Sequence, residues 1–169
     1  MPDTVIKLSK EQAGNLDKQI EKNAQFAMHK VVTRKFTIGA VGVAGCDFNF
    51  VTAANTTAQP KDLGIVIPAF ARILDVVVKT DVTFAGTSIT AFGVTGGTQT
   101  GGVELFASAD LITKDAINQV AVGAGFTLIA VTAAAKHIWI GGAPTGGNWA
   151  ALTAGKMTVY VTYIDNTAE

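Results

Sequence analysis

The sequence predicts an all-β protein: an antiparallel, jelly-roll-like β-sandwich that carries an N-terminal α-helical arm. From residue 36 onward, short stretches rich in Val, Thr and Ala alternate between apolar and polar positions and are separated by Gly, Pro and Asn. Helical spacers, which parallel sheets need as crossovers, do not separate these stretches. The only helical pattern lies before residue 36. We therefore expect an arm over residues 1–35 and a sandwich domain over residues 36–169.

The predicted arm contains a helix over residues 10–29. Ser9 and Gln12 have the spacing of a capping box, in which the two side chains satisfy backbone N–H groups at the start of a helix. A narrow apolar stripe that includes one asparagine follows at helical spacing. Such a stripe fits a self-associating seam or a docking arm, and it fits equally a helix that lies on its own domain. The stripe consists of Ala13, Leu16, Ile20, Asn23 and Ala27.

The elements that follow the arm are predicted strands. Residues 157–164 alternate most clearly, with one face apolar from Met157 to Tyr163 and the other face carrying hydroxyl groups. The glycine-rich stretches 96–102 and 141–147 have the composition of loops. About eight short strands without helices between them make a sandwich or a jelly roll. The other predicted strands are residues 48–50, 64–67, 74–79, 88–94, 103–107, 126–132 and 137–140.

Composition excludes several classes of protein. The chain has 169 residues, of which 49% are hydrophobic and 15% are charged, so it can bury a core and is not disordered. Its 13 basic and 13 acidic side chains give a formal net charge of zero, which provides no field for nucleic acid or anionic lipid. We expect no signal peptide, and the uncharged residues 120–135 are too short and too glycine-rich to span a membrane.

Residues that could carry catalysis or bind a metal are few. His29 ends the predicted helix and His137 lies in a predicted strand, and neither has a second His or Cys at metal-ligand spacing. The segment around Ser88 fails the nucleophile-elbow pattern, and Cys46 has an acidic neighbour that would not favour a thiolate. We therefore expect no metal, no cofactor and no enzymatic activity. The acidic residues that we expect in solvated or turn positions, rather than as an acid–base pair, are Asp75, Asp81, Glu104, Asp110 and Asp115.

Two tryptophans form the one group of residues in the sequence that suggests a ligand site. Trp139 and Trp149 flank the stretch 141–147, which we expect to be a loop. Indole rings at such a loop could stack on a sugar ring. A rim of aromatic side chains at the end of a sandwich or at a subunit contact explains the same pattern equally well.

Several stretches resemble a family of small jelly-roll structural proteins from tailed bacteriophages, the head decoration and head-fibre-like accessory proteins. Residues 63–80 are similar to the family's strand, "IPAGA" and "VLDVxV" pattern, with Phe70 where Gly is usual. Residues 88–94 and 103–111 are similar to its second segment, without the usual Gly-Asp. Residues 152–164 are similar to its closing "LTAGKVTVYVxYI" strand. The resemblance spans about three-fifths of the chain and does not include the predicted helix.

The resemblance implies a non-enzymatic virion component. We expect a protein that decorates or stabilises the capsid surface, with its own copies, as a homotrimer, and the major capsid protein or another virion protein as partners. Neither nucleic acid nor membrane is an expected partner. The alternative is a receptor- or glycan-binding module of a phage tail fibre, with Trp139 and Trp149 at its tip.

Overall fold

The computed structural model describes residues 30–119 and 134–165. The predicted helix over residues 10–29 and the predicted strand over residues 126–132 lie outside the described residues. Residues 30–35, which we grouped with the arm, form the first part of a strand that runs from Lys30 to Gly39. Within the described part of the chain, no helix has the length and apolar character needed to cross a membrane.

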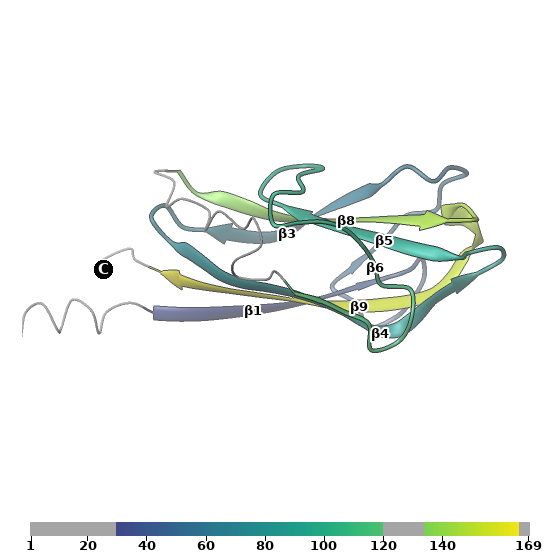
Figure 1. The fold of residues 1–169 in the computed structure, drawn as a ribbon, viewed down its shortest axis with the longest axis horizontal. Coiled ribbons are helices and arrows are strands. Elements are labelled where there is room, and N and C mark those ends of the chain that lie inside the picture. Colours follow the sequence, from purple (N-terminus) through teal and green to yellow (C-terminus); the bar gives the residue numbers. More distant parts are fainter. Residues whose placement is uncertain (1–29, 120–133, 166–169) are drawn as a thin grey trace, which may run out of the picture.

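Two β-sheets face each other across the core, as Figure 1 shows. The first sheet has five strands in the order β2-β1-β9-β4-β7, and the second has four in the order β3-β8-β5-β6. A 3-10 turn, η1, precedes the last of these strands. The elements are β1 (Lys30–Gly39), β2 (Phe48–Asn49), β3 (Gln59–Ile67), β4 (Arg72–Gly86), β5 (Ala91–Gly97), β6 (Phe106–Asp110), β7 (Ile117–Gln119), β8 (Lys136–Thr145), η1 (Trp149–Ala151) and β9 (Leu152–Asp165).

The chain crosses repeatedly between the two sheets. With the two-residue β2 set aside, β1, β4, β7 and β9 belong to the first sheet and β3, β5, β6 and β8 to the second. All pairings in these sheets are antiparallel apart from the short parallel pair of β1 and β2. The prediction of an all-β sandwich is therefore confirmed, and the crossing pattern is that of a jelly roll.

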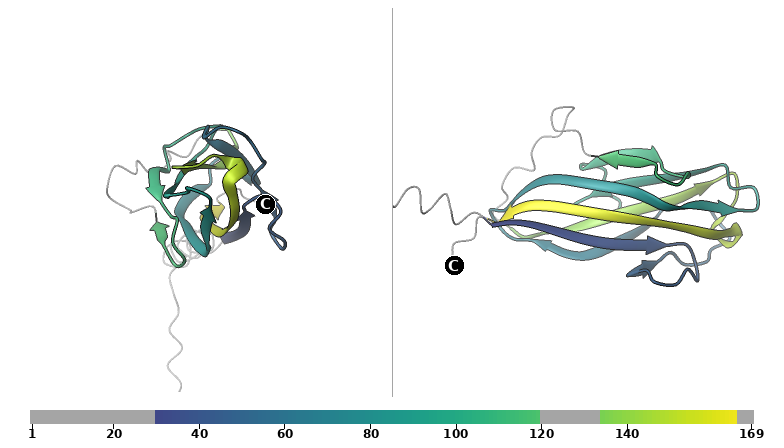
Figure 2. Two further views of the ribbon diagram at one scale, coloured as in Figure 1. Left: turned by 90° about the vertical axis from the view of Figure 1, so that its right-hand side faces the viewer. Right: turned by 90° about the horizontal axis from the view of Figure 1, so that it is seen from below.

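Strand β9 is the centre of the first sheet. It pairs with β1 on one side and with β4 on the other, over most of its 14 residues. Figure 2 shows the three strands side by side. The alternation predicted for residues 157–164 is present, because the side chains of Met157, Val159, Val161 and Tyr163 are all buried.

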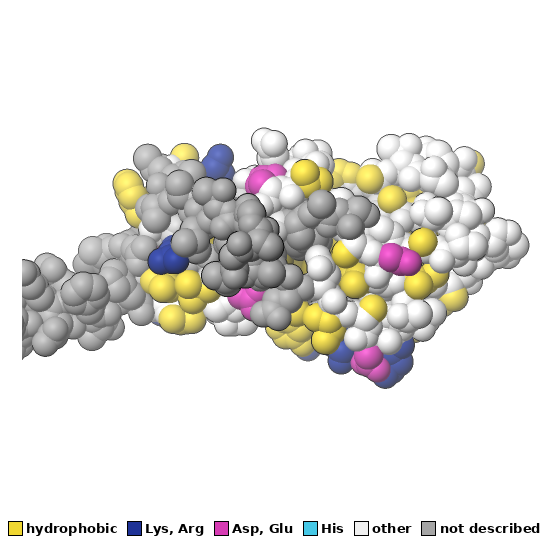
Figure 3. Space-filling view, in the orientation of Figure 1, with side chains coloured by type: hydrophobic (Ala, Val, Ile, Leu, Met, Phe, Trp, Pro, Cys, Tyr) yellow, Lys and Arg dark blue, Asp and Glu magenta, His cyan; other side chains and the backbone are white. Residues whose placement is uncertain are grey.

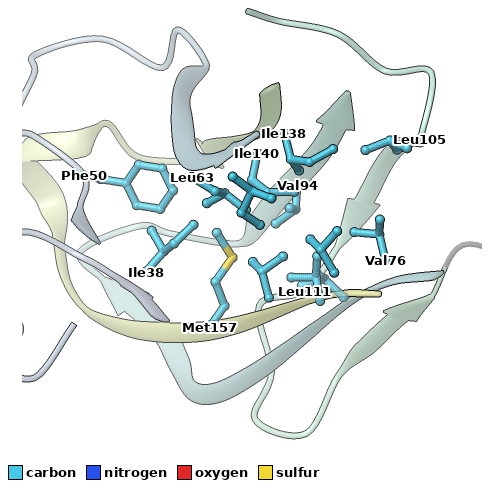
Figure 4. Packing of buried hydrophobic residues seen from close by; sticks show 14 of the residues in the cluster. Ile38, Phe50, Leu63, Val76, Val94, Leu105, Leu111, Ile138, Ile140 and Met157 are labelled. Atoms are coloured by element: carbon cyan, nitrogen blue, oxygen red, sulfur yellow. The ribbon is translucent and has the colours of Figure 1, made fainter. Parts of the chain in front are cut away.

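The core fills the space between the sheets. Figure 4 shows residues from both layers pointing toward one another, with Met157 and Val76 below Ile138 and Ile140. Aromatic rings occupy one part of it. The rings of Phe84 and Phe92 stack with centroids 3.9 Å apart, and the Trp149 ring lies 4.8 Å from that of Phe50. These rings are fully or almost fully buried, so they fix the distance between the sheets.

The prediction of a loop over residues 141–147 is wrong for most of that stretch, because β8 continues to Thr145. Gly142 lies inside this strand, and a glycine is needed there because no side chain would fit, not because the chain turns. A Cβ atom on Gly142 would lie 2.6 Å from Cζ of Phe50 and 2.8 Å from Cζ of Phe92. The strand can therefore pass over the aromatic cluster only where it has no side chain.

Candidate functional site on the outer face of the second sheet

The predicted seam of the arm is not placed by the structure. All five of its residues, as well as His29, lie outside the described residues. The seam therefore stays a prediction from the sequence. The residues concerned are Ala13, Leu16, Ile20, Asn23 and Ala27.

The two tryptophans lie on opposite sides of the second sheet. The Trp149 side chain is fully buried, and its Nε1 donates a hydrogen bond of 2.9 Å to the carbonyl oxygen of Thr57. On β8, Ile138 and Ile140 point into the core, so Trp139 between them points outward. The structure therefore does not bring the two indoles together, and only Trp139 lies where a ligand could reach it.

Trp139 lines an open pocket with a volume of about 390 Å³ on the outer face of the second sheet. We call this hollow the Trp139 pocket. Strands β3 and β8 form its floor, and the loop between β5 and β6 forms one wall. The residues that line it are Asp62, Thr98, Gln99, Thr100, Ala135, Lys136, His137 and Trp139.

A hydrogen bond between two side chains crosses the floor of the Trp139 pocket. Nδ1 of His137 lies 2.8 Å from Oδ2 of Asp62, and these residues are 75 positions apart in the sequence. The other carboxylate oxygen of Asp62 accepts a hydrogen bond of 2.9 Å from the backbone N–H of Gly64. Asp62 therefore holds the bulge of β3 and orients the imidazole at the same time. Nε2 of the imidazole is directed away from the carboxylate.

The wall of the pocket is held by Glu104. Its Oε1 accepts hydrogen bonds of 2.6 Å from both the backbone N–H and the hydroxyl of Thr98. Partial burial raises the pKa of the Glu104 carboxyl, but the hydrogen bonds from Thr98 outweigh it and hold the pKa below its usual value. A Cβ on Gly97 would lie 2.5 Å from the backbone of Gly102. A glycine is required there so that the loop can fold back beside Trp139.

The other predicted carboxylates have structural partners. Oδ1 of Asp110 accepts hydrogen bonds from the backbone of Phe92 and of Ile112. Asp115 pairs with Lys114 at 2.7 Å and with Lys79 at 3.2 Å, and both lysines lower its pKa. In the described ranges, no group of three or more His, Cys, Asp or Glu side chains could hold a metal ion.

The thiol of Cys46 and the carboxyl of Asp81 have local environments that do not suggest catalysis. Burial raises the pKa of the Cys46 thiol, which opposes formation of a nucleophilic thiolate. The hydroxyl of Thr158 donates a hydrogen bond to Asp81. Both groups therefore fit a structural role.

The outer face of the first sheet is a second candidate surface. The hydroxyl groups of Thr33 and Thr162 lie 3.1 Å apart on neighbouring strands, and the ammonium of Lys35 lies 6.0 Å from the centre of the Tyr160 ring. Exposed apolar side chains occur at several places in the described chain, and Figure 3 shows separate hydrophobic groups on one side of the molecule. On this sheet they are Val31, Val82 and Ile117.

The fold is similar to that of chains in solved phage capsids. One is in the capsid asymmetric unit of cyanophage Pam1, with a TM-score of 0.54, 19% sequence identity, and coverage of 80% of this chain and 85% of that chain. Another is in the capsid of Ralstonia phage GP4, with a TM-score of 0.50, 17% identity, and coverage of 82% and 86%. No family model matches the sequence, and no curated protein matches it significantly. At these identities, the likeness establishes the fold.

Sequence reasoning identified Trp139 but missed the rest of its pocket. Asp62 is followed two residues later by Gly64, which has a φ of 66°. This Asp-x-Gly spacing is a signal for a local turn that could have placed Asp62 at a bulge. No sequence signal pairs Asp62 with His137, because that contact depends on the register between β3 and β8.

Proposed function

We propose that the protein is a non-enzymatic structural component of a tailed-bacteriophage virion and that it decorates or stabilises the capsid surface. The observation that carries this proposal is the likeness of the fold, over 80% or more of each chain, to chains found in phage capsid structures. The sequence resemblance supports it independently. The stretches that carry the resemblance include most of β4 and nearly all of β9.

The proposal includes a homotrimer held together through the arm and the edges of the sandwich. Lys30, the first residue of β1, pairs with Asp165, the last residue of β9, so the arm joins the sandwich at one end of the first sheet. Figures 1 and 2 show this end, where β1 starts and β9 finishes. An arm attached there can contact its own copies or a shell protein. Repeated copies on a lattice would then strengthen weak individual contacts.

The location on the particle is tested by electron microscopy of purified virions with a gold-labelled antibody against this protein. We expect gold to be spread over the heads. Gold confined to the tails would contradict decoration and would favour the receptor- or glycan-binding alternative. Particles without label, while the isolated protein binds the antibody, would overturn the virion assignment.

The role of the arm is tested with Leu16→Asp and Ile20→Asp, each of which places a carboxylate on the proposed seam. We expect either change to convert the oligomer to a monomer, as measured by light scattering after size-exclusion chromatography. The circular dichroism spectrum of the sandwich should stay unchanged. Gln25→Asp, on the polar side of the predicted helix, is the matched control. Retention of the oligomer in both seam variants would disprove the seam.

A further inference from the structure

We propose that the Trp139 pocket binds the ring of a neutral saccharide. This proposal concerns a site that the capsid role does not use, and it goes beyond the proposed function. It rests on a partly exposed aromatic side chain, several hydrogen-bonding groups around it, and a local balance of charge. These three features come from residues far apart in the sequence and meet only in the folded sandwich.

The aromatic plane is the indole of Trp139. In the register of the second sheet, Trp139 is paired with Asp62 on β3 and with Gly97 on β5. Gly97, the residue of β5 beside Trp139, has no side chain. The loop wall can therefore pack close to this position, next to the indole. The indole is partly buried and partly exposed, and its exposed part lines the pocket. The apolar C–H face of a pyranose ring can pack on such a surface.

Groups that bond to hydroxyls surround this plane. His137 is oriented by its contact with Asp62, and its Nε2 is therefore directed away from that carboxylate. Gln99 and Thr100, whose side chains carry an amide and a hydroxyl, are exposed residues that also line the pocket. A few convergent polar groups around an apolar surface are typical of small-molecule sites, and the volume of about 390 Å³ lies within their usual range.

The charges favour a neutral ligand. The pocket contains one carboxylate, that of Asp62, and one ammonium, that of Lys136, so its formal charge is zero while His137 is neutral. A phosphate or a carboxylate ligand would meet the Asp62 carboxylate on the floor. A cation would find that same carboxylate already bonded to His137 and to the backbone of Gly64.

The site is organised before any ligand arrives. Glu104 fixes the backbone and the hydroxyl of Thr98, and the N–H of Gly102 donates to the carbonyl of Gln99 at 2.9 Å, which closes the turn of the loop. Asp62 fixes the imidazole. The loop backbone and the imidazole are therefore held in place before a ligand binds, which lowers the entropic cost of ordering them.

The proposal is tested on the full chain with two probes. The first is a glycan array that contains neutral and acidic glycans. The second is saturation-transfer NMR with the methyl glycosides of glucose, galactose, mannose and N-acetylglucosamine. We expect at least one neutral glycoside to bind, with its signals strongest for the protons of one ring face. We expect Trp139→Ala and Gln99→Ala each to weaken binding tenfold or more. Tyr160→Ala, on the outer face of the first sheet, is the matched aromatic control and should bind as the wild type does.

Three outcomes would overturn the proposal. One is that no neutral glycan binds on the array or in the NMR experiment. Another is that acidic glycans alone bind. The third is that Trp139→Ala and Gln99→Ala, each with an unchanged circular dichroism spectrum, bind as tightly as the wild type. None of these results bears on gold labelling of the virion, so the failure of this site and the failure of the proposed function are distinguishable.

Discussion

Trp149 and Trp139 are chemically identical and ten residues apart, yet they have opposite roles. Trp149 lies within the aromatic cluster, where its indole contacts Phe50 and Phe92 and its N–H reaches the carbonyl of Thr57. Trp139 stands on the outer face of β8. We expect Trp149→Ala to lower the free energy of unfolding by about 3–5 kcal/mol, because it leaves a large cavity and an unbonded carbonyl.

Urea unfolding measures this effect. Trp139→Ala is the matched control. We expect it to lower the free energy of unfolding by well under half as much as Trp149→Ala, because the Trp139 side chain is only partly buried. Equal losses in the two variants would mean that the assignment of core and surface indoles is wrong.

Gly142 is a second residue whose size is set by the core. Gly142→Val would drive a side chain into the rings of Phe50 and Phe92, which already contact each other. We expect a loss of about 1–3 kcal/mol in the free energy of unfolding, as is usual for overpacking. Ala143→Val, the neighbouring position on the outer side of the same strand, should change it by only about 0.5 kcal/mol.

Asp47 makes stability depend on pH. The backbone N–H and the hydroxyl of Thr37 both donate to its carboxylate, at 2.7 and 2.8 Å, and they lower its pKa in the folded state. Because its pKa is lower in the folded state, Asp47 stabilises the fold fully at pH values above its pKa in the unfolded chain, which is about 3.9. This contribution is lost as the pH falls through the lower pKa of the folded state. We expect the melting temperature to fall below about pH 4, and to fall less steeply in Asp47→Asn.

Thermal melts between neutral and acidic pH measure the difference. A variant whose curve parallels that of the wild type through the acidic range would show that Asp47 does not contribute.

At the scale of the elements, a long alternating strand was easier to predict than a glycine-rich one. The residues of β9 alternate between apolar and hydroxyl side chains, and this pattern directly predicts a strand with one buried face. The second half of β8 contains Gly-Gly-Ala-Pro, and this composition predicts a turn rather than a strand. What decides its structure is the closeness of two phenylalanine rings from other strands, and a local pattern contains no such information.

The pocket could be predicted only in part, for the same reason. Trp139 was identified as an aromatic residue beside a glycine-rich stretch. Asp62 lies beside Trp139 because β3 pairs with β8, and the loop wall lies beside it because β5 pairs with β8. Register is a long-range property, and the sequence of one strand does not specify its partner's position.

The loop between β5 and β6 is an element whose order depends on one side chain. Because Glu104 bonds to Thr98 through both backbone and hydroxyl, we expect Glu104→Ala to raise the hydrogen-exchange rate of the Thr98 amide at least tenfold. Amides of β9 should keep their protection. Loss of protection throughout the molecule would show that Glu104 supports the whole fold, whereas an unchanged Thr98 amide would show that the contact does not hold the loop.

At the scale of the whole molecule, the described residues contain a hydrophobic core that involves nearly every strand. The buried cluster draws on both sheets and includes residues from Ile38 to Tyr163. We therefore expect a chain that begins at Lys30 to fold, with a melting temperature within a few degrees of the full chain's and with loss of the proposed oligomer. Calorimetry and light scattering measure both. A shortened chain that fails to fold would show that residues 1–29 cover part of the sandwich.

The position of β9 has a consequence for the timing of synthesis. This strand comes after every other described element in the chain, yet it joins β1 to β4 in the first sheet. While the ribosome makes residues 40–151, β1 lacks β9, the strand with which it forms its ten-residue antiparallel pairing. The first sheet therefore closes only when residues up to 165 have left the exit tunnel. A chain released early by a premature stop lacks the strand that unites the sheet, so such a product should be degraded rather than added to a growing assembly.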